Sequence, residues 1–198
     1  MDLFTTLFST GWASGVNAYA TVALLGILGR AGIGDIPEPL QSDPVIAAAS
    51  VMYAIEFVTD KVPYLDNLWD ALHTVIRPAI ASSIGAVYGG DADLGALDET
   101  LAAGGSGATA LASHAVKAAV RLGINTSPEP ASNIITSLAE DGLVALVVVF
   151  AVENPELAAI LAGVLLVLGI ALVVFLARRV RRGLERWRAR RAARRAPP

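Results

Sequence analysis

The chain has 198 residues, of which 55% are hydrophobic and 17% are charged, and its formal net charge is −3. A mean hydropathy of +0.59 is too high for an ordinary soluble domain, and the absence of cysteine excludes disulfides and thiolate chemistry. Several stretches approach the roughly 20 apolar residues that a helix needs to cross a bilayer. The sequence therefore predicts an all-α, polytopic integral membrane protein.

Six helices are predicted from the apolar runs and from the glycines and prolines that separate them. The clearest run, from Leu157 to Ala177, contains no charged residue. The third helix is the weakest span, because its first half is amphipathic and because Pro78 is expected to kink or break it. The predicted helices cover residues 4–30, 44–61, 66–90, 98–122, 132–152 and 155–178.

Two decapeptides, RAGIGDIPEP at 30–39 and RLGINTSPEP at 121–130, match at six positions with an offset of 91 residues. We therefore expect two three-helix membrane repeats, residues 1–90 and 91–177, followed by a tail, residues 178–198. Because each copy has an odd number of spans, the second would be inserted upside down relative to the first. Inverted repeats are a known transporter architecture, with the binding site near the midplane between them.

The tail concentrates the positive charge of the chain. It contains ten arginines and one glutamate, whereas residues 1–177 carry 17 acidic and 5 basic residues. Arginines directly beyond a span are typical of the cytoplasmic side, so we expect a cytoplasmic C-terminus in a cell inner membrane. Their position favours contact with the lipid bilayer and its anionic headgroups over nucleic-acid binding.

Charged residues inside the predicted helices form stripes instead of being scattered around them. Each helical residue advances by about 100°, so spacings of three, four and seven residues keep side chains on one face. Such stripes occur in the second, third and fourth helices, and an acidic pair lies inside the fifth. The predicted polar network comprises Glu56, Asp60, Lys61, Asp66, Asp70, His73, Arg77, His114, Lys117, Arg121, Glu140 and Asp141.

A charge at the centre of a bilayer costs from about 2.5 to well over 10 kcal/mol, so the stripes are expected to face one another or a watery cavity. Two interpretations are open. In one, acids and bases form a structural salt-bridge network that holds the bundle together. In the other, some carboxylates stay unpaired or share a proton, and they bind a cation or relay protons.

Other polar features also admit more than one role. Asn17 and Tyr19 interrupt the first predicted helix, and they either line a cavity or bond to a neighbouring helix. The glycine-rich stretch 104–109 predicts close helix packing or a local break, and it lacks the lysine of a phosphate loop. His73 and His114 with nearby acids are possible metal ligands, but they belong to different copies, so no metal or other cofactor is expected.

The strings EFVTDKVPYLD, WDALHTVIRP and HAVKAAVR together resemble a bacterial membrane-protein family described only as a domain of unknown function. The resemblance covers most of residues 10–165, and its most specific part is the pattern E-x3-D-K-x-P-x2-D that begins at Glu56. It implies a multi-span inner-membrane protein and no known substrate. The arginine-rich tail lies outside it.

The leading hypothesis is a small secondary transporter or channel that moves protons or small ions through the polar network. One alternative is a non-transporting membrane scaffold or assembly factor in which the network is structural. Another is an enzyme that modifies lipid headgroups and holds phosphate with the basic stripe of the fourth helix, although no hydrolase motif is present. The small size of the chain is compatible with a homodimer.

Overall fold

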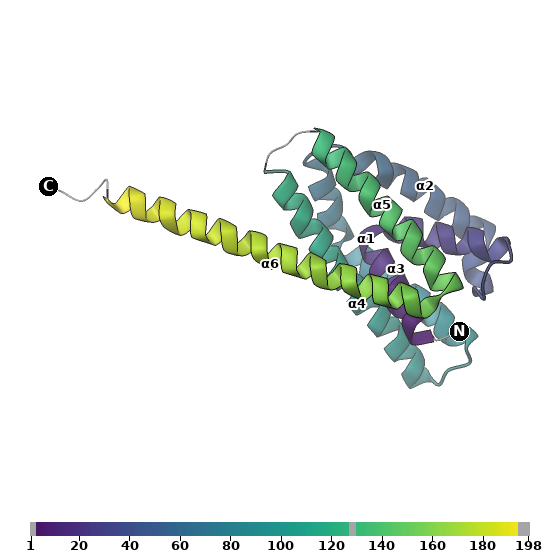
Figure 1. Ribbon diagram of the computed structural model, residues 1–198. Helices are drawn as coiled ribbons and strands as arrows, with labels where there is room; N and C mark the ends of the chain where they lie inside the picture. Colours follow the sequence, from purple (N-terminus) through teal and green to yellow (C-terminus); the bar gives the residue numbers. More distant parts are fainter. Residues whose placement is uncertain (1–2, 127–129, 194–198) are drawn as a thin grey trace.

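The computed structural model describes residues 3–126 and 130–193, and the regular structure in these ranges is entirely helical (Figure 1). The predicted all-α class is confirmed, and all six predicted helices are present. One short 3-10 helix, η1, is added between the first two. The elements are α1 (Leu3–Arg30), η1 (Glu38–Gln41), α2 (Asp43–Thr59), α3 (Leu65–Asp91), α4 (Ala96–Ile124), α5 (Pro130–Glu153) and α6 (Pro155–Ala193).

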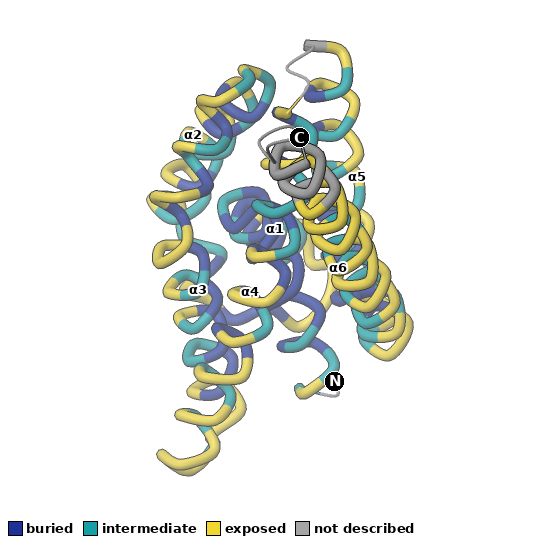
Figure 2. Tube along the Cα trace, turned by 90° about the vertical axis from the view of Figure 1, so that its left-hand side faces the viewer, coloured by how far each residue is buried: buried dark blue, intermediate teal, exposed yellow. Residues whose placement is uncertain are grey.

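Helix α1 lies at the centre of the bundle and packs against all five of the other long helices. Its residues are buried almost without interruption from Thr6 to Ala18, in contrast to the exposed α6 (Figure 2). Serine, glycine and alanine dominate the middle of this segment, and such small side chains let neighbouring backbones approach closely. Helix α1 is therefore the common packing partner of the fold.

Two glycines of α1 determine how closely α4 approaches it. A Cβ atom at Gly11 would lie 2.8 Å from the backbone oxygen of Ser106, and one at Gly15 would collide with Ser113 and Ala110. Ser106 belongs to the glycine-rich stretch 104–109, through which α4 remains continuous. Of the two roles expected for that stretch, close packing is the one observed.

Helix α3 continues through Pro78 as a single helix, so of the kink or break predicted at this residue the break does not occur. Proline removes a backbone donor and crowds the preceding turn. The turns around Pro78 nevertheless lie tightly against α4, where Gly85 and Gly107 allow a close approach. A Cβ atom at Gly85 would lie 2.6 Å from the backbone oxygen of Ala102. Packing along this seam keeps α3 helical across the proline.

Three of the described helical segments are long and apolar enough to cross a membrane, namely Leu3–Arg30, Ala131–Glu153 and Pro155–Gly183. The chain is therefore a membrane protein. Helix α2 has only 17 residues, and α3 and α4 carry buried charges. A total of six spans accordingly stays a prediction.

Helix α6 was expected to end near residue 178, but it continues to Ala193 and projects away from the bundle (Figure 1). Arginine and alanine both favour helix, and Arg181 pairs with Glu185 one turn later at 3.1 Å. The arginine-rich segment is thus a helical extension of the last apolar helix. Residues 194–198 of the tail, and Pro128 and Glu129 of the second Pro-Glu-Pro sequence, lie outside the described residues.

The two predicted repeats each contribute three helices, but their packing differs. Helix α2 packs mainly against α1 of its own half, and α5 also packs mainly against α1, with little contact to α4. Helix α1 therefore packs against the helices of both predicted repeats. The inverted repeat and the domain boundaries at residues 90 and 177 stay predictions.

We expect Gly15→Ala to lower the free energy of unfolding by about 1–3 kcal/mol, because the added methyl group overpacks the contact between α1 and α4. Gly104→Ala is the matched control. Gly104 lies in α4, and no atom lies within 4 Å of a Cβ atom placed there. The free energy of unfolding of this variant should therefore rise by up to about 1 kcal/mol, because alanine has a higher helix propensity than glycine. Thermal unfolding of the detergent-purified variants measures both effects, and an unchanged Gly15→Ala protein would contradict the packing described.

Candidate functional site

Helix α1 is interrupted at Asn17, whose φ of −150° and ψ of 98° are extended instead of helical. The single helix predicted over residues 4–30 is therefore not continuous. The Asn17 side chain caps the second half, because its Oδ1 accepts a hydrogen bond from the Ala20 N–H at 2.9 Å. Helix α1 thus consists of two half-helices that meet inside the bundle with a change of direction (Figure 1).

The break leaves carbonyl oxygens of the first half-helix without partners inside the helix. Two buried cations bind there: Arg77 of α3 donates to the Gly15 oxygen at 3.2 Å, and Lys117 of α4 donates to the Val16 oxygen at 3.0 Å. The helix dipole also favours cations at a helix C-terminus. The break therefore provides a physical reason for two positive charges at the centre of an apolar bundle.

Carboxylates from neighbouring helices surround both cations. Arg77 Nη2 lies 2.8 Å from Glu56 Oε1 of α2 and 3.1 Å from Asp70 Oδ1 of its own helix. Lys117 Nζ lies 2.8 Å from Asp60 Oδ2, at the end of α2, and 3.6 Å from Glu56 Oε1. All five side chains are buried. Because Glu56 contacts both cations, the two groups form one continuous cluster.

Arg121 extends this cluster by one turn along α4. Its Nη2 lies 2.6 Å from Glu140 Oε2 of α5, and its Nη1 lies 3.7 Å from Asp66 Oδ2 of α3. Asp66 also accepts hydrogen bonds from Asn125 Nδ2 at 2.8 and 2.9 Å. Lys117 lies 3.6 Å from the same Glu140 oxygen, which links α5 to both cations of α4.

The structure brings eight of the twelve predicted polar residues into one group, which we call the ion network. Its side chains come from α2, α3, α4 and α5, and α1 contributes the carbonyls at its break. The ion network consists of Glu56, Asp60, Asp66, Asp70, Arg77, Lys117, Arg121 and Glu140.

Both predicted histidines lie beside the ion network. His114 Nδ1 accepts a hydrogen bond from Arg77 at 2.7 Å, and its Nε2 donates to the backbone oxygen of Asp70 at 3.0 Å, which fixes a neutral tautomer. His73 Nε2 accepts from the Tyr19 hydroxyl at 2.9 Å, and its Nδ1 donates to a backbone oxygen one turn earlier. Each ring nitrogen is thus engaged within the protein and not available to a metal ion.

Lys61 and Asp141 lie outside the ion network, and neither forms a salt bridge within the described part of the chain. Lys61 donates to Ser137 Oγ at 3.2 Å and covers the ring of Phe57. Asp141 Oδ1 accepts a hydrogen bond from Asn17 Nδ2 at 3.2 Å. The residue that caps the second half of α1 is therefore also tied to α5.

Two asparagines of the site, Asn125 and Asn133, were not expected from the sequence. Asn125 binds Asp66, and Asn133 Oδ1 accepts a hydrogen bond from Arg121 Nη1 at 2.9 Å. Helical spacing places each asparagine on the same face as a charged residue of the network. Asn125 follows Arg121 by four residues, and Asn133 precedes Glu140 by seven. The stripes contain only charged residues and histidines, so these two asparagines fall outside them.

Acids outnumber bases in the ion network by five to three. Several buried oxygens also lack a hydrogen-bond partner, namely Glu56 Oε2, Asp60 Oδ1 and both carboxylate oxygens of Asp70. Leaving a buried polar atom unsatisfied costs about 1–3 kcal/mol, and more for a charged group. Two buried donors of the same site, Arg77 Nε and Asn133 Nδ2, also lack an acceptor, so the excess of acidic over basic side chains is the clearer sign of imbalance in the ion network.

A cavity of about 230 Å³ between α1, α4, α5 and α6 reaches the ion network. Lys117 and Glu140 line it, and the Glu140 side chain is the most exposed of the network at 15%. Tyr19 lines a separate, apolar cavity of about 400 Å³ between α1, α2 and α3. The 230 Å³ cavity thus meets the ion network at Lys117 and Glu140.

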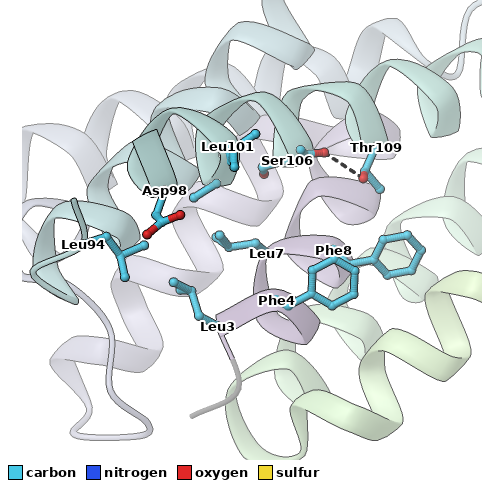
Figure 3. Close-up of a pocket in the computed structure, with 11 residues that line it drawn as sticks. Leu3, Phe4, Leu7, Phe8, Leu94, Asp98, Leu101, Ser106 and Thr109 are labelled. Atoms are coloured by element: carbon cyan, nitrogen blue, oxygen red, sulfur yellow. Dashed lines mark hydrogen bonds between the residues drawn. The ribbon is translucent and has the colours of Figure 1, made fainter. Parts of the chain in front are cut away.

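The largest of the described cavities, about 580 Å³, lies elsewhere, between the start of α1 and the start of α4. Figure 3 shows its mainly apolar wall, in which Leu7 of α1 faces Leu101 of α4 and Phe4 and Phe8 lie to one side. No residue of the ion network lines it. Its size alone does not make it the functional site.

We expect Arg121→Met to lower the free energy of unfolding by about 3–5 kcal/mol, because it leaves the buried carboxylates of Glu140 and Asp66 without their shared cation. Arg181→Met is the control, since that side chain is 83% exposed and its pair with Glu185 contributes at most about 1 kcal/mol. Denaturation in detergent micelles measures the free energy of unfolding of both variants. If Arg121→Met lowered it as little as Arg181→Met does, the ion network would not hold the bundle together.

The comparisons with known proteins identify a family for this chain. The family model for a domain of unknown function, DUF4126, matches residues 4–175, a range that contains all of the ion network and stops before the arginine-rich tail. No curated protein and no solved structure gives a match. The resemblance seen in the sequence is confirmed: the chain belongs to the DUF4126 family of domains of unknown function.

Proposed function

We propose that the chain is a small membrane transporter or channel that moves protons or small ions through the ion network. The observation that carries this proposal is the imbalance of the network. Five buried carboxylates share three cations, and buried carboxylate oxygens remain without donors. A purely structural network would be expected to satisfy its polar atoms, because each unsatisfied one lowers stability. Excess buried acid instead suits a site that takes up protons or cations.

The interruption of α1 supports the same function. Discontinuous helices form the ion and substrate sites of many secondary transporters, because the freed carbonyls and helix dipoles lie at the midplane. Here Arg77 and Lys117 occupy the carbonyls at the end of the first half-helix, and Asn17 caps the second. A change in the charge of the network would therefore act directly on the point where α1 bends.

The 230 Å³ cavity supplies an entrance. Water or an ion in this cavity would first meet Glu140 and Lys117, and Lys117 is bonded directly to Asp60 at 2.8 Å. The cavity does not itself reach Asp60, so Lys117 separates the deeper carboxylates from the entrance. We infer that movement of the Lys117 side chain opens the path between the two.

The wider organisation belongs to the same proposal. We infer two inverted three-helix repeats with the ion network between them, in an inner membrane with the C-terminus in the cytoplasm. The exposed arginines that continue α6, among them Arg178 and Arg182, would contact anionic lipid headgroups. A homodimer remains compatible with the small size of the chain.

The scaffold alternative is favoured by a different observation. Each of the three cations contacts at least two carboxylates, and all three are nearly inaccessible to solvent. Such cross-links between helices would hold a small bundle together without transport. The lipid-modifying enzyme has less support, because acids already surround the basic stripe of His114, Lys117 and Arg121, which phosphate would have to reach.

We expect purified protein in liposomes to dissipate an imposed proton gradient, and Glu140→Gln to slow this flux by about tenfold or more, equivalent to about 1.4 kcal/mol. Glu153→Gln, an exposed acid near the end of the same helix, is the matched control and should retain the wild-type rate. A pH-sensitive dye inside the vesicles reports the flux. No flux in the wild type above empty vesicles, for protons or for Na⁺ and K⁺, would reject transport and favour the scaffold.

A further inference from the structure

Helix α2 is held in the bundle mainly by its polar contacts. Of its 17 residues, all of which the structure describes, three are buried, namely Ala49, Glu56 and Thr59. Within this described helix none of the large apolar side chains is buried, and α2 lies at the edge of the bundle (Figure 2). Helices in a membrane are held together by close packing and by polar contacts. With so few buried side chains, the position of α2 depends on the polar ones.

The two ends of α2 are attached differently. At its start the helix packs closely on α1, since a Cβ atom at Gly26 would lie 2.5 Å from the Ile46 side chain. At its end the contacts are ionic, and they come from Glu56 and Asp60, which bind the cations of α3 and α4. The connection to α3 contains Tyr64, whose φ of 69° is in the left-handed region that residues other than glycine rarely adopt. The start of α2 is thus a fixed end, and the connection at Tyr64 is a place where the chain can change direction.

A cavity separates α2 from α3 over part of their length. This apolar cavity of about 400 Å³ has Ala48 and Met52 of α2 on one wall and Ile80 and Ser83 of α3 on the other. Interdigitated side chains resist displacement, whereas side chains on opposite walls of a cavity do not contact each other. Helix α2 can therefore move relative to α3 at this level with little loss of apolar contact.

The charges of the ion network divide along the same line. Glu56 belongs to α2, and Asp60 directly follows its last residue. Without these two acids, the network contains three acids and three bases, so the whole negative excess is carried at the end of α2. The balanced part consists of Asp66, Asp70, Arg77, Lys117, Arg121 and Glu140.

Each cation also keeps an acidic partner within the balanced part. Arg77 lies 3.1 Å from Asp70, and Arg121 lies 2.6 Å from Glu140. Lys117 lies 3.6 Å from the same Glu140 oxygen, and both Arg77 and Lys117 bind carbonyls at the break of α1. The end of α2 can thus leave the network without leaving a buried cation unpaired, which would be strongly destabilising.

We propose that α2 is a gate, whose C-terminal half swings away from α4 about its fixed start and separates Glu56 and Asp60 from the cations of the ion network. The separation leaves the two carboxylates without counter-charge, so a cation that binds to them favours the open position. The closed position returns when Arg77 and Lys117 replace that cation. This inference rests on the proposed function, for which it names the moving helix and the two carboxylates that meet the transported ion.

Distances between spin labels test the movement, because the chain has no other cysteine to react with the label. Labels at Val58→Cys of α2 and Leu111→Cys of α4, both exposed positions, report on the gate. We expect Glu56→Gln combined with Asp60→Asn to shift this distance to longer values, since both ionic attachments of α2 lose their charge.

Two controls accompany this measurement. Labels at Leu72→Cys of α3 and Leu111→Cys should keep their distance in the same double variant, because α3 and α4 carry the balanced part of the network. Asp43→Asn removes an exposed acid at the fixed start of α2, and it should leave the distance between Val58 and Leu111 unchanged. An unchanged gate distance in the double variant would overturn the proposal. So would an unfolded double variant, because the balanced part would then not stand without the acids of α2.

A cross-link tests whether flux needs the movement. Met52→Cys and Ser83→Cys lie on opposite walls of the 400 Å³ cavity, so a bifunctional thiol reagent can join α2 to α3. We expect the joined protein to lose its flux in the vesicle assay, and each single variant treated with the same reagent to retain it. Full flux in the joined protein would contradict the gate.

The two measurements separate this inference from the proposed function. A gate distance that shifts as expected in a protein that passes no ions would retain the movement of α2 and reject transport. Flux that survives the cross-link would leave transport standing, and it would show that α2 is not the gate.

Discussion

A positive charge can be buried in an apolar bundle only where oxygen atoms replace the water it loses. In this protein the break of α1 at Asn17 exposes the carbonyls of Gly15 and Val16, to which Arg77 and Lys117 bind. The two cations in turn permit carboxylates on α2 and α3 to be buried beside them. The polar interior of the fold thus depends on one residue of α1 that leaves the helical conformation.

The packing of the bundle follows from the same requirement. Lys117 of α4 reaches a carbonyl of α1, and Gly11 and Gly15 allow the backbone of α4 to approach α1 closely. The glycines beside the break therefore serve the polar contacts as well as the apolar core. Helix α6 takes no part in the ion network and leaves most of its surface to lipid. This division accounts for the uncharged apolar run from Leu157 to Ala177 and for the position of the arginines of α6 after that run.

Much of this architecture could be predicted from the sequence, because helical periodicity and apolar runs act locally. The stripes of α3 and α4 identified Asp70, Arg77 and Lys117 as inward-facing before their partners were known. The break at Asn17 could not be predicted, since it is stabilised by cations on α3 and α4 that are distant in sequence. The continuity of α3 at Pro78 likewise depends on packing against α4.

The most direct test of the account is whether water reaches the ion network. The chain has no cysteine, so Thr136→Cys places a single thiol in the wall of the cavity that contains Lys117 and Glu140. We expect a charged thiol reagent, which reacts only in water, to modify this thiol in vesicles as it modifies the exposed control Thr100→Cys. Complete protection of the Thr136→Cys thiol while the control reacts would show a dry cavity, and it would make the network a structural cross-link instead of a path for ions.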